Sequence, residues 1–598
     1  MKFLLVAINS KFIHSNPAVY SLKSYAERYI GKSEENTIEI EIAEYTINQQ
    51  LEDILSDIYR RMPDFLGISC YIWNFDMVRN MLSEIPKILP NTGVFLGGPE
   101  VSYHPERVME EFPYLKGIMI GEGEATFAEL VCACSDVAEQ GSDELNVQVD
   151  ADVAAQGSDE LNAQVDADAA EQGRDELNAK IKSIPGLYLS CGYTAMREPL
   201  TMDEVPFFYK DADAFEDRIL YYESSRGCPY NCSYCLSSID RTLRLRTFEE
   251  VKEHLDYFLT KKVKQVKFID RTFNANHEHA MAVWKYILKN DNGVTNFHFE
   301  IAADILRDDE IELISKMRPG LVQLEIGVQS TNEKTLHEIN RYVDTDHIRE
   351  VTARLLKPHN AHIHLDLIAG LPYEDYQSSI KSFNDVFGMR PHQLQLGFLK
   401  VLKGTVMEEH IEDYGLKYLS TPPYEVLSSK WISYDEIRNL KDVEKVLEDY
   451  YNTAQFTQTL PELMKLFDTP FDFFDSLARF YRTNNYFVKT PARSRKYEIL
   501  LEFTKNVIES ENAPKLRNIA QLPDENMRSD GNGLRDENVF EDYIELIRNK
   551  LTLDYYLREN PKSRPDFVKE VPDLRAFDYS RRDPITNNVN LYVCDIRC

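Results

Sequence analysis

Three cysteines that lie close together are the residues of this chain best suited to chemistry. Residues 226–240 read RGCPYNCSYCLSSID, which spaces Cys228, Cys232 and Cys235 as C-x3-C-x2-C. One short loop can aim three such sulfurs at a common point and hold a metal centre. A structural zinc site normally closes with a fourth protein ligand, whereas a cubane iron–sulfur cluster on three cysteines leaves one iron open.

The sequence that follows offers no fourth ligand for a zinc knuckle or an electron-transfer cluster, since the next histidine is His254 and the next cysteine is Cys594. The motif resembles the signature of the radical S-adenosylmethionine (SAM) superfamily, which has an aromatic residue before the last cysteine, here Tyr234. This resemblance implies a [4Fe-4S] cluster on the three cysteines. SAM would bind its open iron and be cleaved to methionine and a 5′-deoxyadenosyl radical.

Six candidate strands alternate with helical stretches from residue 219 onward, and six is the strand number of the partial β/α barrel in this superfamily. The strands are expected near 219–223, 266–270, 297–301, 321–326, 362–367 and 393–397. Because strand side chains alternate between faces, the polar side chains of four strands share one face. They are His298 and Glu300; Gln323, Glu325 and Gln329; His362, His364 and Asp366; Gln393 and Gln395.

The apolar faces of these strands must meet the surrounding helices, so the polar faces are expected to line the barrel lumen. A polar lumen indicates a cavity for a polar ligand, because an ordinary closed barrel fills its interior with branched apolar side chains. A buried network in which these groups satisfy one another is the alternative.

The resemblance also suggests where SAM is bound. The second strand ends FIDRTFN where many members have a Gly-Gly-Glu that meets the methionyl amino group, which makes Asp270 and Arg271 candidates. Glu300 stands where the family often binds the ribose hydroxyls, while Gln329 and the turn at Gly370 would border the nucleoside. Three arginines just past the loop either clamp an anion or lead into a helix: Arg241, Arg244 and Arg246. Two histidines are expected on the surface, His277 and His279.

The first 200 residues also alternate between strands and helices, which predicts a doubly wound parallel sheet with ligands at the carboxyl ends of its strands. Strands are expected at 3–8, 38–42, 65–70, 93–96 and 117–120, with a last one near 184–189. Glycine turns at 97–98 and 121–123 let backbone approach a ligand. This pattern resembles the cobalamin-binding-type domain that precedes many radical SAM barrels.

Two readings of this domain stay open. The D-x-H-x-x-G loop that supplies an axial histidine to cobalt in one class is absent, and His14 is the only histidine at a nearby strand end. Some radical SAM relatives bind cobalamin without that histidine. Cobalamin is therefore one expectation, and a scaffold that is empty or contacts substrate is the other.

The remaining organisation predicts three parts: a Rossmann-like domain at 1–200, a radical SAM partial barrel at 201–430 and a helical C-terminal domain at 431–598. A 16-residue repeat at 137–181 is strongly acidic and cannot bury a core of its own, so it is expected to be a surface insertion. The C-terminal domain is expected to cap the barrel and shape its pocket, or to be structural only.

Composition narrows the class of protein. The 598 residues carry a net charge of −31, which disfavours nucleic acid as a partner, although the acidic repeat supplies much of it. No run is long and apolar enough for a membrane span, and the nine cysteines show no disulfide framework, so a cytoplasmic protein is expected.

The leading hypothesis is a radical SAM enzyme that abstracts hydrogen from a polar small molecule and cleaves or rearranges a bond, with queuine lyase as a specific candidate. A flavodoxin or ferredoxin would donate the electron. A cobalamin-dependent radical SAM methyltransferase is the first alternative. A non-catalytic iron–sulfur redox protein is the second.

Overall fold

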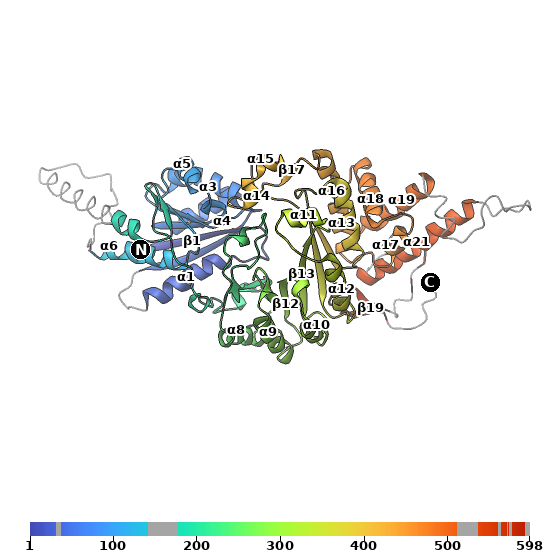
Figure 1. The fold of residues 1–598 in the computed structure, drawn as a ribbon, viewed down its shortest axis with the longest axis horizontal. Coiled ribbons are helices and arrows are strands. Elements are labelled where there is room, and N and C mark those ends of the chain that lie inside the picture. Colours follow the sequence, from blue (N-terminus) through green and yellow to red (C-terminus); the bar gives the residue numbers. More distant parts are fainter. Residues whose placement is uncertain are drawn as a thin grey trace, which may run out of the picture.

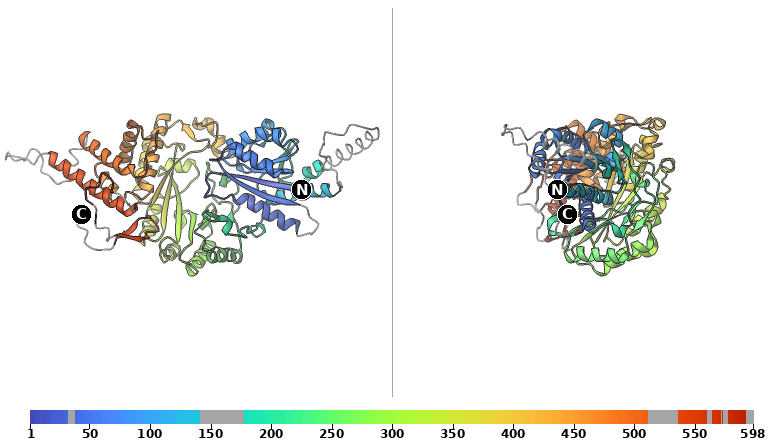
Figure 2. Two further views of the ribbon diagram at one scale, coloured as in Figure 1. Left: turned by 180° about the vertical axis from the view of Figure 1, so that it is seen from behind. Right: turned by 90° about the vertical axis from the view of Figure 1, so that its left-hand side faces the viewer.

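The computed structural model describes residues 1–31, 38–140, 177–510, 536–559, 564–570, 572 and 577–591. Most of the acidic repeat at 137–181 lies outside these ranges. The N-terminal sheet, the central barrel and the C-terminal helices follow one another along the long axis of the molecule (Figures 1 and 2). Among the described residues, no helix combines the length and apolarity needed to cross a bilayer.

The N-terminal domain is built on one seven-stranded sheet in the order β2-β1-β3-β4-β5-β6-β7. The first five strands are parallel, as the sequence predicts, whereas β6 and β7 run antiparallel. The predicted last strand is therefore a short hairpin, because a two-residue connection can join only antiparallel neighbours. The strands are β1 (Lys2–Asn9), β2 (Glu39–Thr46), β3 (Phe65–Ser69), β4 (Gly93–Gly97), β5 (Gly117–Met119), β6 (Leu187–Leu189) and β7 (Gly192–Tyr193).

Helices cover both faces of this sheet, which explains the unbroken apolar run of β1. Phe3, Leu5 and Ala7 pack in the cluster of α1 (Pro17–Ile30) and α6 (Glu124–Gln140). Leu4, Val6 and Ile8 pack in the opposite cluster. The helices of that second face are α2 (Leu51–Arg61), α3 (Phe75–Ile88), α4 (Pro99–Ser102) and α5 (Pro105–Glu111).

The central domain is an open barrel of six parallel strands in the order β8-β11-β12-β13-β14-β15. All six strands predicted from the sequence are present: β8 (Leu220–Tyr222), β11 (Gln265–Phe268), β12 (Asn296–Ile301), β13 (Val322–Gln329), β14 (His362–Ala369) and β15 (Gln393–Phe398). Its outer helices are α8 (Phe248–Thr260), α9 (His277–Lys289), α10 (Asp308–Ser315), α11 (Glu333–Glu338), α12 (Thr345–Leu356) and α13 (Tyr376–Phe387).

The strand faces divide as the alternation predicts. Phe297, Leu324 and Leu365 are fully buried in the apolar cluster formed with the helices. The polar side chains of the other face meet one another in register, since Glu300 pairs with Glu325 and Glu325 with His364.

The C-terminal region has no separate core, because its apolar side chains belong to the same cluster as those of the barrel. Phe471, for example, lies 5.4 Å from Phe383 of α13, measured between ring centroids. Its elements are α14 (Val406–Glu409), α15 (Ile411–Tyr414), β16 (Lys417–Tyr418), β17 (Val426–Ser428), α16 (Tyr434–Leu447), the π-turn η6 (Glu448–Asn452), α17 (Thr459–Met464), α18 (Pro470–Thr483), α19 (Arg495–Ser510), α21 (Asp536–Arg558), β18 (Phe577–Arg582) and β19 (Val589–Leu591).

Both edges of the open barrel are covered by other parts of the chain. At the β15 edge, the Asn452 side chain accepts from Leu394 N (2.9 Å) and donates to Leu394 O (2.8 Å), as a neighbouring strand would. At the β8 edge, Ile219 N donates to Ile13 O (2.9 Å) of the N-terminal domain. Unpaired strand edges invite association, and these contacts protect them.

Candidate functional site: the cysteine loop and the cavity between two domains

The three cysteines lie in a loop between the short strands β9 (Ser225–Arg226) and β10 (Arg244–Leu245). Gly227 opens the loop with a φ of +85°, and a Cβ there would lie 2.2 Å from Thr242 O, so only glycine fits. Cys228 and Cys232 are buried and Cys235 is partly exposed, all as free thiols. Burial raises the pKa of Cys232, and nearby Arg341 acts in the opposite direction.

Arg341 was not predicted from the sequence as a site residue. Its buried guanidinium donates to Gly327 O of β13 and contacts Cys232 Sγ at 3.8 Å. Its charge also acts on the phenol of Tyr234, whose pKa burial raises. Arg341 therefore joins the cysteine loop to the barrel wall.

Asp270 is buried and does not line the cavity described below. It is 1% exposed and accepts hydrogen bonds from Ser224 N (3.1 Å), Ser224 Oγ (2.6 Å) and Ser225 Oγ (2.6 Å). Burial raises its pKa to about 6. The carboxyl group thus holds the strand that leads into the cysteine loop, and the predicted contact of Asp270 with SAM stays a prediction.

His279 completes this buried group. Ser224 Oγ lies 2.9 Å from His279 Nε2, and the imidazole is 8% exposed. The expectation that His279 is a surface residue is therefore wrong, because the N-terminus of α9 turns its side chain inward beneath the loop.

The other predicted SAM contacts are spread along the barrel. Arg271 is exposed and lines the cavity described below. Glu300 lies 3.4 Å from Lys267, and burial raises its pKa. Gln329 has a φ of +72° and a buried Oε1 without a hydrogen bond, a strained arrangement typical of ligand sites. Gly370 has a φ of +85°, and a Cβ there would meet Val426.

A cavity of about 1150 Å³ separates the carboxyl ends of the N-terminal strands from the cysteine loop. One wall is formed by turns after β1, β3, β4 and β5, including Ser10, Tyr71, Gly98 and Gly121. The barrel side contributes Glu223, Arg226, Leu236, Ile239 and Arg271.

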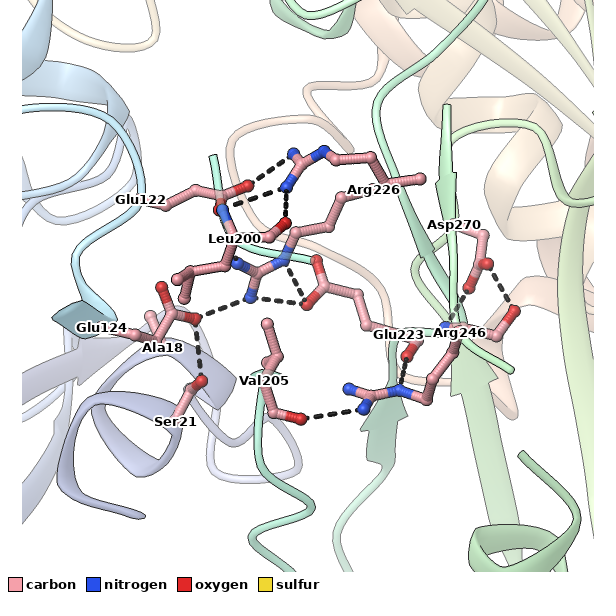
Figure 3. Close-up of polar contacts among 12 residues, drawn as sticks. Ala18, Ser21, Glu122, Glu124, Leu200, Val205, Glu223, Arg226, Arg246 and Asp270 are labelled. Atoms are coloured by element: carbon pink, nitrogen blue, oxygen red, sulfur yellow. Dashed lines mark hydrogen bonds and ion pairs between the residues drawn. The ribbon is translucent and has the colours of Figure 1, made fainter. Parts of the chain in front are cut away.

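Ion pairs across the boundary fix this arrangement (Figure 3). Arg226 Nη2 bonds Glu124 of the N-terminal domain at 2.7 Å and Glu223 of the barrel at 2.9 Å. Arg244 bonds Glu122 at 2.6 Å. Arg246 is 5% exposed and donates to Val205 O at 2.8 Å. Arg244 and Arg246 are thus paired with protein groups, which speaks against the anion clamp.

The N-terminal wall suits a large flat cofactor such as cobalamin. Gly121 has a φ of +77°, and a Cβ there would meet no atom within 4 Å, so its backbone borders open space. Gly98 is required on the other side, because a Cβ would lie 2.5 Å from Cys70 O. His14 lines the cavity, but its Nδ1 lies 2.5 Å from Tyr221 Oη.

Comparison with protein families gives three matches along the chain. Residues 4–131 match the B12 binding domain, residues 222–385 the radical SAM superfamily and residues 412–588 a protein family of unknown function, DUF4080. The chain therefore contains a B12-binding domain and a radical SAM domain. The first two matches support the predicted cofactors: a [4Fe-4S] cluster, SAM and cobalamin.

Individual proteins similar to this chain combine the same two names, radical SAM and cobalamin, or are methyltransferases. It is 25% identical over 367 residues to cobalamin-dependent radical SAM methyltransferase TokK of Streptomyces tokunonensis, covering 59% of this chain and 50% of that protein. It is 26% identical over 338 residues to 2-(S-pantetheinyl)-carbapenam-3-carboxylate methyltransferase of Streptantibioticus cattleyicolor, covering 54% and 44%. The chain thus spans about half the length of these relatives.

The solved structure of the cobalamin-dependent S-adenosylmethionine radical enzyme OxsB with aqua-cobalamin and SAM shares the fold of this chain. The two superpose with a TM-score of 0.54 at 15% identity, covering 95% of this chain and 82% of that one. This likeness confirms the predicted fold class.

The relatives correct the leading functional hypothesis. A bond-cleaving or rearranging enzyme, with queuine lyase as the candidate, was expected from the polar lumen and from the missing axial histidine. That interpretation is wrong, because the two Streptomyces and Streptantibioticus relatives named above are methyltransferases. Neither feature distinguishes the two reaction classes, since both need a polar substrate pocket.

Proposed function

We propose that this enzyme is a cobalamin-dependent methyltransferase that acts on a polar small molecule. The observation that carries the proposal is the shared cavity, whose walls bring Gly98 and Gly121 of the B12-binding domain opposite Leu236 and Ile239 of the cysteine loop. When bound there, the cluster and SAM supply reductive cleavage of SAM, and cobalamin supplies a methyl carrier. The protein residues hold these groups and exclude water.

Each cofactor has proposed contacts in the chain. Cys228, Cys232 and Cys235 bind the cluster, with Tyr234 beside it. Arg271, Glu300, Gln329 and the turn at Gly370 surround SAM, and Asp270 positions the cysteine loop. Gln329 is supported by its strained backbone and its unpaired buried oxygen.

The partners and division of the chain follow from the same features. The substrate enters the polar barrel lumen, and a flavodoxin or ferredoxin supplies the electron. No disulfide joins the cysteines of the described residues, which supports a reducing, cytoplasmic compartment. The proposed domains remain 1–200, 201–430 and 431–598, although the third family match already begins at residue 412.

Anaerobic reconstitution tests the proposal. The full chain, loaded with iron, sulfide and hydroxocobalamin, is incubated under reduction with SAM that carries a deuterated methyl group and with a bacterial metabolite extract. We expect bound corrinoid, S-adenosylhomocysteine formed beside 5′-deoxyadenosine, and a metabolite that gains the labelled methyl group. Turnover that yields 5′-deoxyadenosine alone, with no labelled product, would contradict methyl transfer.

Alanine variants of Cys228, Cys232 and Cys235 test the cluster assignment. We expect each to lose the visible absorbance of the cluster and the formation of 5′-deoxyadenosine, because thiolates are the iron ligands. C191A is the matched control, since that thiol is exposed and outside the loop. Retained SAM cleavage in a triple variant would refute the assignment.

A further inference from the structure

We propose that the barrel lumen holds a divalent transition-metal ion, separate from the iron–sulfur cluster, bound by Glu325, His364 and Asp366. One potential ligand atom from each of these side chains lies within 4.8 Å of the other two. His364 and Asp366 point the same way from β14 because they are two residues apart, and Glu325 is the register partner of His364 on β13.

Unsatisfied buried nitrogens provide the second, independent observation. The His364 side chain is 7% exposed and that of His298 is 9% exposed, and Nε2 of each is buried without a hydrogen bond. Asp366 Oδ1 is also buried without a hydrogen bond. Buried polar atoms normally have a hydrogen-bond partner, so the unsatisfied His364 Nε2 and Asp366 Oδ1, both in the three-residue group, indicate a missing ligand.

The distances within the group would allow hydrogen bonds as well as coordination, but the angles do not suit hydrogen bonds. His364 Nε2 lies 3.0 Å from Asp366 Oδ1, and His298 Nε2 lies 2.9 Å from Glu325 Oε2, yet neither contact has hydrogen-bond geometry. Metal–ligand bonds of about 2.1 Å place neighbouring ligands of an octahedral ion about 3.0 Å apart.

The charge of the lumen favours a cation. Glu300, Glu325 and Asp366 contribute three carboxylates, against the ammonium of Lys267 inside the lumen and the guanidinium of Arg271 after β11. Lys267 contacts Glu300 at 3.4 Å and Glu325 at 3.1 Å. Within the part of the chain that the structure describes, Asp366 has no lysine or arginine partner.

The ligand types narrow the identity of the ion. Imidazole together with carboxylates suits manganese, iron or zinc better than calcium or magnesium, which prefer oxygen alone. The lumen is also accessible, since the Glu300 side chain is 36% exposed and that of Asp366 is 16% exposed.

The site lies close to the reaction centre. Asp366 is the register partner of Gly327, whose carbonyl accepts from Arg341, and Arg341 contacts Cys232. An ion here could orient an oxygen-bearing group of the substrate. That role rests on the proposed function, whereas metal binding is measured without turnover and can fail or succeed independently.

Manganese serves as the probe. The full chain with its reconstituted cluster is treated with a chelator, titrated with Mn²⁺ and followed by electron paramagnetic resonance. We expect one tightly bound Mn²⁺ whose spin-echo modulation shows directly coordinated imidazole nitrogen. E325Q, H364A and D366N should each weaken binding about 10–100-fold, in the range seen when metal-site groups are removed.

H277A is the matched control and should bind Mn²⁺ like the parent. His277 belongs to a second group with Asp309 and Glu310, in which Asp309 is exposed. The proposal is overturned if the parent binds no Mn²⁺, if the bound ion shows no nitrogen coupling, or if H277A alone loses it. The nitrogen coupling is measured on the parent, so a variant that misfolds does not decide the test.

Discussion

Arg341 is the residue on which the environment of the cysteine loop depends most directly. A single buried guanidinium contacts both a cluster-binding candidate, Cys232, and the carbonyl of Gly327 in the barrel wall. Hydrogen bonds and charges near the sulfurs tune the reduction potential of an iron–sulfur cluster. Arg341 can therefore control how easily the enzyme is reduced.

Replacing Arg341 with methionine should make the cluster harder to reduce. Without the cation beside Cys232, we expect the potential to fall by an amount on the order of tens of millivolts, measured by redox titration of the reconstituted enzyme. R341K keeps the charge but not the fork of donors, so it should recover part of the shift. An unchanged potential in R341M would show that the guanidinium is only structural.

At this scale, some of the site follows from strand parity. In β11 and the turn after it, the odd-numbered side chains face the lumen or the cavity: Lys267, Ile269 and Arg271. The even-numbered side chains, Phe268 and Asp270, point outward and are buried. The period-two rule that grouped Glu325, His364 and Asp366 would also have turned Asp270 away. Arg341 could not be found this way, because it lies on a loop and reaches Cys232 through tertiary structure.

Among the elements, η6 supports the last barrel strand. Asn452 makes two hydrogen bonds to the backbone of Leu394. In N452A the amide of Leu394 loses its partner, and we expect the free energy of unfolding to fall by about 1–3 kcal/mol in urea denaturation. N452D keeps the acceptor but loses the donor, so its free energy of unfolding should lie between those of the parent and N452A. Equal stability of parent and N452A would contradict the edge-protecting role.

The contact between α21 and α17 predicts a dependence on pH. Asp554 of α21 accepts from Gln458 N at 2.8 Å and from Thr459 N at 2.9 Å, at the start of α17, and burial raises its pKa to about 7. A raised carboxyl pKa means that the folded state binds the proton more tightly. The resulting stability is present at low pH and is lost as pH rises through about 7.

D554N tests this sign, because its amide does not titrate. Relative to D554N, the parent should lose on the order of 3 kcal/mol of unfolding free energy between about pH 4 and pH 7, and change little above that range. D542N changes an exposed carboxylate of the same helix, and its stability should depend on pH as that of the parent does. A difference that grows with pH would mean that Asp554 is stabilised as the anion.

For the whole molecule, the joint between the B12-binding domain and the barrel depends on Glu100. This carboxylate is 6% exposed and binds Lys403 Nζ at 2.6 Å and the Tyr424 hydroxyl. Since both domains wall the cavity, we expect E100Q to retain less hydroxocobalamin on gel filtration, by about tenfold in affinity. E110Q, an exposed glutamate of the same domain, should bind like the parent.

Sequence reasoning was sufficient for the order of the domains but not for how they share cores. The helical character predicted for the C-terminal region is confirmed, yet the sequence did not reveal that Phe471 packs against Phe383 of the barrel. Periodicity identifies an apolar face but not its partner. The glycine turns of the N-terminal sheet were predicted to approach a ligand, but the cysteine loop on the opposite side of the cavity was not, because only tertiary structure brings the two together.

The covered edges of the barrel bear on how the chain folds during synthesis. The β8 edge is covered by Ile13, which is synthesised before that strand. The β15 edge is covered by Asn452, which is synthesised more than fifty residues after that strand. Until that turn emerges, the nascent barrel exposes an unprotected strand, the kind of surface that chaperones bind. Ribosome stalling just before Asn452 should thus leave a more chaperone-dependent chain than stalling well after it.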